Sequence, residues 1–217
     1  MKIKICGLRR VEDIAYANEV KPDFAGFILS RGFRRSISDD EARELSCRLH
    51  PEIQKVGVFV NDSPERIVSF LQDGTIDMAQ LHGRESEEDI LYVKAMTGKP
   101  LIKALKVENR YVVEAWLDSA ADYLLLDSGT GSGKTFDWRI LEELFLEMGG
   151  ELPKPFFLAG GLNADNLEEA QKRWRPYAVD LSSSVETDGI KDLNKMREVV
   201  SRVRSLSEKE SKSLSGI

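Results

Sequence analysis

Short apolar runs, rich in β-branched and aromatic residues, recur eight times along the chain. Each has the length of a strand, and its residues are apolar almost throughout, which is typical of strands covered on both faces. The expected strands are residues 2–6, 24–29, 55–60, 77–81, 100–105, 122–127, 155–159 and 178–182.

The segments between these runs have helical spacing. Ala42, Leu45 and Leu49 share one face of the second segment, where Cys47 is also expected in the core. Asn163 is a suitable N-cap for the seventh helix. Each strand is therefore expected to be followed by a helix.

Eight strand–helix units of roughly 22 to 33 residues predict parallel strands joined by crossover helices, an α/β fold. This number of units favours a single closed (β/α)8 TIM barrel. An open doubly wound sheet is the alternative, because hydrophobic periodicity does not reveal closure. We expect one domain over residues 1–204 and a polar, frayed C-terminal tail over 205–217.

Composition narrows the functional class. The 217-residue chain carries a net charge of −6, which argues against a nucleic-acid surface. Two cysteines are too few for a disulfide framework, and no apolar run reaches membrane-spanning length, so we expect a cytoplasmic protein that does not engage a membrane. No cluster of residues has metal-ligand spacing, so no metal is expected. We expect a monomer or a homodimer.

The apolar run that ends at Asp127 leads into a glycine-rich stretch, residues 128–138. Gly133-Lys134-Thr135 resembles the end of a phosphate-binding P-loop, but that motif requires glycine where this chain has Ser128. A nucleoside triphosphatase is therefore disfavoured. A carboxyl group emerging from a core-like run is partly desolvated, which would suit Asp127 to act as an acid. Capping a helix or pairing with Lys134 are its alternative roles.

In a barrel of this kind, function is confined to the C-terminal ends of the strands. Gly160-Gly161 follows the seventh strand and Ser182-Ser183-Ser184 ends the eighth, where such barrels often bind phosphate. A plain strand-to-helix turn is the alternative for the glycines. Cys6 ends the first strand; it is either a small core residue or a base, and a base would need a site that lowers its pKa. His82 follows the fourth strand and is either structural or part of the site.

Six motifs, in chain order, resemble the phosphoribosylanthranilate isomerase family, and the resemblance spans roughly residues 2 to 204. They begin at Lys4, Val56, Gln80, Gly131, Leu158 and Val179, and read KICG, VGVFVN, QLHG, GSGKTFDW, LAGGLN and VDLSSSVE.

The resemblance implies a cofactor-free barrel of tryptophan biosynthesis, an aldose–ketose isomerase. Its reaction converts N-(5′-phosphoribosyl)anthranilate into 1-(2-carboxyphenylamino)-1-deoxyribulose 5-phosphate by an Amadori rearrangement. By motif, Cys6 would be the general base at C2′ and Asp127 the general acid at the ring oxygen. Arg35, rather than Arg34, would hold the anthranilate carboxylate.

The remaining site residues implied by the resemblance bind the substrate. His82 and Asp180 would contact it, and the phosphate would lie against Gly160, Gly161, Ser182, Ser183 and Ser184. The family usually has glycine at the position of Ser184, so the phosphate loop departs slightly from the pattern. The glycine-rich loop after Asp127, the expected lid, is also short.

Two other functions remain open from the sequence. A histidine-pathway isomerase, or a dual-substrate enzyme, performs the same rearrangement, but these enzymes tend to use two aspartates where this chain offers Cys6 and Asp127. A phosphate- or nucleotide-binding module without catalysis would leave Cys6 and Asp127 idle.

Overall fold

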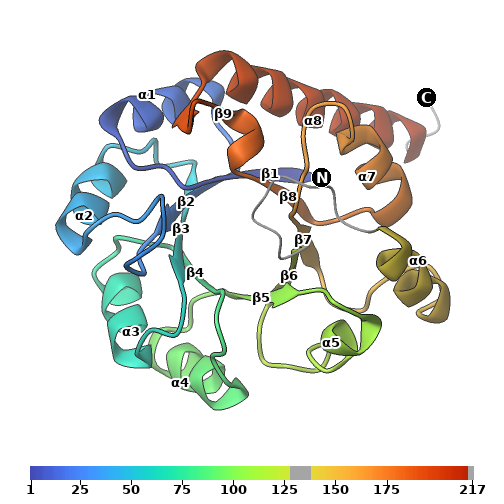
Figure 1. Cartoon of the computed structure of the whole chain (residues 1–217), viewed down its shortest axis with the longest axis horizontal. Coiled ribbons are helices and arrows are strands. Elements are labelled where there is room, and N and C mark those ends of the chain that lie inside the picture. Colours follow the sequence, from blue (N-terminus) through green and yellow to red (C-terminus); the bar gives the residue numbers. More distant parts are fainter. Residues whose placement is uncertain (128–137, 215–217) are drawn as a thin grey trace.

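The computed structural model describes residues 1–127 and 138–214, with side chains up to residue 209. Eight parallel strands close into a barrel in chain order, with β1 paired to β8 (Figure 1). The predicted (β/α)8 fold is thereby confirmed, and the strands are β1 (Lys2–Cys6), β2 (Phe24–Ile28), β3 (Gln54–Phe59), β4 (Met78–Leu81), β5 (Leu101–Lys106), β6 (Tyr123–Asp127), β7 (Phe156–Leu158) and β8 (Ala178–Leu181).

Helices surround the barrel, one in each crossover and a last one after β8 (Figure 1). Acidic first turns and serine N-caps start several of them, as at Ser38, Ser63 and Ser86. The helices are α1 (Val11–Val20), α2 (Asp39–Cys47), α3 (Pro64–Gln72), α4 (Glu87–Thr97), α5 (Arg110–Glu114), α6 (Trp138–Glu147), α7 (Leu167–Trp174) and α8 (Leu193–Leu214).

The apolar core has two parts, because successive side chains of a strand point to opposite faces. One part lies between the strands and the helices and includes Ile3, Ile5 and Leu124. The other fills the barrel interior with residues such as Phe24, Leu125 and Phe157. The inward-facing positions nearest the C-terminal strand ends are instead polar, and they form the site: Cys6, Gln80, Asp127 and Asp180.

Two local predictions were wrong. Cys47 is exposed, because it is the last residue of α2 and lies off the buried stripe that contains Ala42 and Leu45. The N-cap of α7 is Asn166 rather than Asn163. The Asn163 side chain instead accepts hydrogen bonds from the backbone of Asp165 and Asn166, which makes it part of the turn before the helix.

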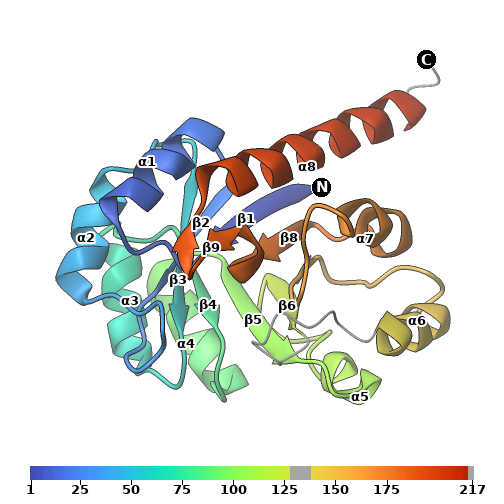
Figure 2. The same ribbon diagram turned by 45° about the horizontal axis from the view of Figure 1, so that its top comes forward.

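The C-terminal helix α8 packs beside α1 and α7 and runs on past the end of the barrel (Figure 2). It extends to Leu214 and so includes most of the predicted tail. Leu206 is buried, and the Ser207 hydroxyl donates to the carbonyl oxygen of Met1. Fraying at the very end of the chain stays a prediction. No helix among the described residues is long and apolar enough to span a membrane.

A small antiparallel hairpin, β9 (Glu186–Thr187) and β10 (Ile190–Lys191), follows β8 and was not predicted. The Glu186 carboxylate accepts from Lys191 Nζ at 2.9 Å, from Arg35 Nε at 2.6 Å and from Arg34 Nη2 at 2.6 Å. Burial acts to raise the pKa of Glu186, but Arg35 and Lys191 outweigh it and lower the pKa to about 2. This carboxylate therefore ties the hairpin to the loop after β2.

Replacing Glu186 with glutamine tests how much this carboxylate stabilises the fold. The folded-state pKa lies below the ordinary value of 4.5, so the contribution is complete above pH 4.5 and is lost as the pH falls towards 2. In urea unfolding at pH 7, we expect Glu186→Gln to lower the free energy of unfolding by on the order of 3 kcal/mol.

The difference from wild type should shrink between pH 4.5 and pH 2, the range set by the two pKa values. Glu108→Gln is the control, because Glu108 pairs with Lys106 on the surface and should leave the unfolding midpoint unchanged. Equal effects of the two variants at pH 7 would contradict the account.

Candidate active site

A cavity of about 360 Å³ opens at the C-terminal ends of the strands. It is lined by all of the residues that the sequence analysis assigned to the site. The strands β1, β2, β4, β6, β7 and β8 and the loops after them carry these residues: Cys6, Arg35, His82, Asp127, Gly160, Gly161, Asp180, Ser182, Ser183 and Ser184.

Cys6 ends β1 and is 7% exposed, at the wall of the cavity. A Cβ at Gly26, on the neighbouring strand, would lie 2.8 Å from Cys6 Sγ, so the thiol occupies space that only glycine leaves. Burial raises the pKa of the Cys6 thiol; Lys4 acts to lower it and Asp180 to raise it. Burial outweighs Lys4, so the pKa of Cys6 is raised, and the lowered pKa that a base needs is not present in the free protein.

Asp127 ends β6 and is held near His82, which follows β4. His82 Nε2 lies 3.5 Å from Asp127 Oδ2, and its Nδ1 lies 2.9 Å from Nε2 of Gln80. Gln80 is 1% exposed and also lines the cavity. Both of the imidazole's nitrogens therefore face polar partners, which places His82 in the site. The alternative partner for Asp127, Lys134, lies outside the described residues, as does the predicted lid.

Arg35 and Arg34 differ in how they meet the cavity. The Arg35 side chain is 18% exposed and lines the cavity, whereas Arg34 is 62% exposed and does not. Gly7 makes room for Arg35: its φ is +79°, and a Cβ there would come within 2.5 Å of Arg35 Cδ. Glu186 accepts from Arg35 Nε and Nη2, and these two hydrogen bonds hold the guanidinium beside the cavity.

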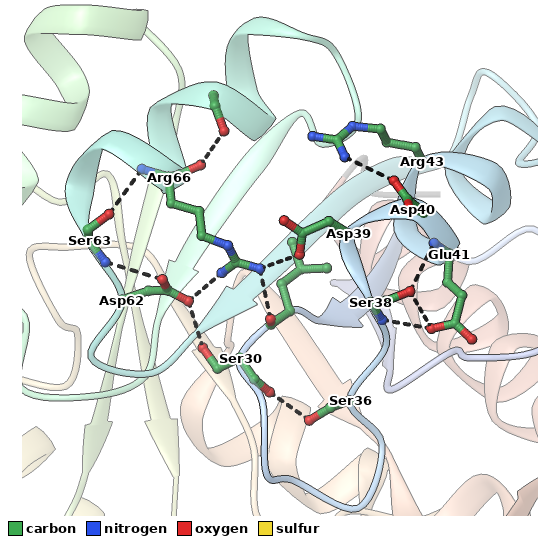
Figure 3. A network of polar contacts seen from close by, with 12 residues as sticks. Ser30, Ser36, Ser38, Asp39, Asp40, Glu41, Arg43, Asp62, Ser63 and Arg66 are labelled. Atoms are coloured by element: carbon green, nitrogen blue, oxygen red, sulfur yellow. Dashed lines mark hydrogen bonds and ion pairs between the residues drawn. The ribbon is translucent and has the colours of Figure 1, made fainter.

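The loop that carries Arg35 is anchored at both ends by a polar network (Figure 3). Arg66 of α3 contacts Asp62, and it donates to Asp39 at 2.6 Å and to the Leu29 carbonyl oxygen at 3.1 Å. Ser30 donates to Asp62 at 3.2 Å. The network joins the loops after β2 and β3, so the position of Arg35 is set by two neighbouring units of the barrel.

Gly160 and Gly161 follow β7 with φ values of +89° and +71°. This left-handed backbone favours glycine, and the missing Cβ atoms let the chain lie close to a ligand. Asn166 fixes the turn by donating to the Gly161 carbonyl oxygen at 3.1 Å. In the loop after β8, Ser182 precedes a short 3₁₀ turn over Ser183–Val185. The polar loops after β7 and β8 therefore line the same cavity.

Several residues of the site were not assigned to it from the sequence. Lys4 is fully buried and contacts Asp180 at 3.0 Å, and Gln80, Glu186 and Lys191 hold the groups described above. A lysine between Ile3 and Ile5, in the middle of the first strand, was the available signal for Lys4. Within residues 1–127 and 138–209, no three acidic, histidine or cysteine side chains form a group that could hold a metal ion.

Comparison with known proteins agrees with this geometry. The family model of N-(5′-phosphoribosyl)anthranilate (PRA) isomerase matches residues 3–202. The N-(5′-phosphoribosyl)anthranilate isomerase of Endomicrobium trichonymphae is 47% identical over 210 residues, which cover 94% of this chain and 99% of the relative.

Solved structures show the same likeness. The crystal structure of phosphoribosyl anthranilate isomerase from Thermus thermophilus has a TM-score of 0.82 and 37% identity, covering 95% of this chain and 100% of that one. A second isomerase, in complex with reduced 1-(o-carboxyphenylamino)-1-deoxyribulose 5-phosphate, has a TM-score of 0.81 and 33% identity, covering 94% and 99%. With its barrel, its cavity and a family match from β1 into α8, the chain belongs to the N-(5′-phosphoribosyl)anthranilate isomerase family.

Proposed function

We propose that Cys6 and Asp127 carry the acid–base chemistry by which this chain isomerises N-(5′-phosphoribosyl)anthranilate. The observation that supports this most is their placement: they end β1 and β6, three strands apart through β8 and β7, and both line one cavity. An aldose-to-ketose rearrangement needs one acid and one base at different atoms of the sugar, and this pair meets that requirement.

The proposed steps balance without a redox partner. Asp127 protonates the furanose ring oxygen, the bond from that oxygen to C1′ breaks, and the amine nitrogen forms a Schiff base with C1′. The Cys6 thiol gives up its proton to solvent, and the resulting thiolate removes the proton from C2′. The electron pair of the C2′–H bond forms the C1′–C2′ double bond of an enolamine, and the electron pair of the C1′=N bond returns to nitrogen. A proton added at C1′ and one lost from the C2′ hydroxyl complete the ketone.

Other residues of the cavity would position the substrate. We assign the anthranilate carboxylate to Arg35, whose guanidinium can bind it through parallel hydrogen bonds. The phosphate would lie between Gly160-Gly161 and Ser182 to Ser184, the usual place for phosphate in such barrels. His82 and Asp180 would contact the sugar between these two ends. A related isomerase was crystallised with a reduced, phosphorylated compound, which supports a ligand of this class.

The setting of the reaction is also part of the proposal. A charge of −6 and the absence of a membrane-spanning helix among the described residues agree with a cytoplasmic enzyme that binds neither nucleic acid nor membrane. We expect a monomer or a homodimer that uses no cofactor.

Turnover of phosphoribosylanthranilate, followed by the loss of its fluorescence, tests the proposal. Wild-type protein should convert the substrate. Cys6→Ala and Asp127→Asn should each lower kcat by about 10²- to 10⁴-fold, because each removes one proton-transfer group. Cys47→Ala is the matched control, because Cys47 is exposed on α2 and should leave kcat unchanged. Near-normal rates in both site variants, with circular dichroism intact, would refute the residue roles; no turnover by wild type would refute the function.

The two arginines after β2 give a separate prediction. Arg35→Ala should raise KM by about 10- to 100-fold, since a hydrogen-bonded charge is removed from the anthranilate carboxylate. Arg34→Ala should have a much smaller effect, although Arg34 also contacts Glu186, because its side chain lies outside the cavity. Steady-state kinetics of the two variants gives the two KM values. Equal KM values would mean that the assignment of the carboxylate to Arg35 rather than Arg34 is wrong.

A further inference from the structure

Lys4 is a charged side chain with no exposure to solvent. Its neighbours on β1, Ile3 and Ile5, pack in the core between strands and helices, so Lys4 and Cys6 point into the barrel. Burying an ammonium group is costly unless it is well paired. A lysine at this position therefore calls for an explanation beyond packing.

A carboxylate binds the Lys4 ammonium, and a thiol lies on the same inward face of the strand. Asp180 stands directly opposite Lys4 in the pairing of β1 with β8, and its carboxylate oxygens accept from Lys4 Nζ at 3.1 and 3.0 Å. Cys6 is two residues further along β1 and, like Lys4, points into the barrel. One buried cation thus lies beside both a carboxylate and the thiol that we assign as the base.

The other charges around Cys6 come from three further elements. Asp180 lies on β8, Lys191 on β10, and Arg35 in the loop after β2. Arg35 and Lys191 are both bonded to Glu186, which offsets their charge. Asp180 in turn faces Asp127 and His82. Lys4 is likewise bonded to Asp180, but it is the cation that shares the inward face of β1 with the thiol.

Burial and the neighbouring charges shift the pKa values of Cys6 and Lys4. Burial raises the pKa of Cys6, and Lys4 is the largest influence acting against it. Burial would lower the pKa of Lys4 itself, but Asp180 and Cys6 together raise it above the ordinary value. The raised pKa means that the Lys4 ammonium group is charged at neutral pH.

We propose that Lys4 is a positioning residue for the base: its buried ammonium group stabilises the thiolate of Cys6, and Asp180 holds that ammonium group in place from β8. The inference rests on the proposed function in that Cys6 is taken as the base. When the thiolate removes the C2′ proton, the S–H bond forms, the C2′–H bond breaks, and the Lys4 charge is left paired with Asp180.

The ionisation of Cys6 can be measured without turnover. In a Cys47→Ser background Cys6 is the only thiol, and the rate of its alkylation by iodoacetamide across pH reports the thiolate fraction. Lys4→Met should raise the apparent pKa of Cys6 by about one to three units, the usual effect of a nearby opposite charge. Asp180→Asn should lower it, because an anion beside the thiolate is removed.

Lys103→Met is the matched control. Lys103 is also a buried barrel lysine, 3% exposed, and it forms an ion pair with Glu85. Removing Lys103 takes the cation away from Glu85, just as removing Lys4 takes the cation away from Asp180. It should leave the Cys6 titration unchanged. If Lys4→Met does not fold, Lys4→Met/Asp180→Asn, compared with Asp180→Asn alone, should still show the upward shift. An unchanged titration in the Lys4 variant, or an equal shift in the Lys103 variant, would overturn the proposal.

Kinetics distinguishes this inference from the function on which it rests. The rising limb of the kcat/KM profile against pH should move upward with Lys4→Met and return towards the wild-type position with Lys4→Arg, which keeps the charge. If wild type does not turn over the substrate, the proposed function fails while the alkylation result still decides the role of Lys4. If wild type is active and the limb does not move, the role of Lys4 fails alone.

Discussion

Closure of the parallel barrel is the constraint on which the site depends. Pairing β1 with β8 places Lys4 opposite Asp180 and closes the ring of strands whose C-terminal ends carry Cys6, Asp127 and the loops after β7 and β8. Because all eight strands run in the same direction, their C-terminal ends meet at one face of the barrel. An open sheet of the same strands would separate β1 from β8 and with them the thiol from its charged neighbours.

Within that barrel, buried charge is confined to pairs. Three lysines that are at most 3% exposed each meet a carboxylate: Lys4 with Asp180, Lys103 with Glu85, and Lys191 with Glu186. The first two pairs join different strand–helix units and the third joins the two strands of the hairpin after β8, and each pair lies beside the cavity or beside a loop that lines it. Such pairs contribute little net stability compared with apolar packing. Here these ion pairs fix the positions of side chains and loops around the cavity.

The strands were predictable because buried parallel strands are continuous apolar runs, and their predicted ends lie within one residue of the observed ones. The residues around the cavity were predictable because chemistry in this fold lies at strand ends. Contacts between side chains of different strands were not predictable, because nothing in the sequence around Lys4 indicates that it pairs with Asp180. The exposure of Cys47 and the cap at Asn166 depend on where a helix starts or stops, which periodicity locates poorly.

The most direct test is a crystal structure of this protein with reduced 1-(o-carboxyphenylamino)-1-deoxyribulose 5-phosphate. We predict the phosphate between Gly160-Gly161 and Ser182 to Ser184, the aromatic carboxylate on Arg35, and Cys6 and Asp127 on opposite sides of the sugar carbons. A phosphate bound elsewhere, or sugar carbons that neither Cys6 nor Asp127 contacts, would contradict the account.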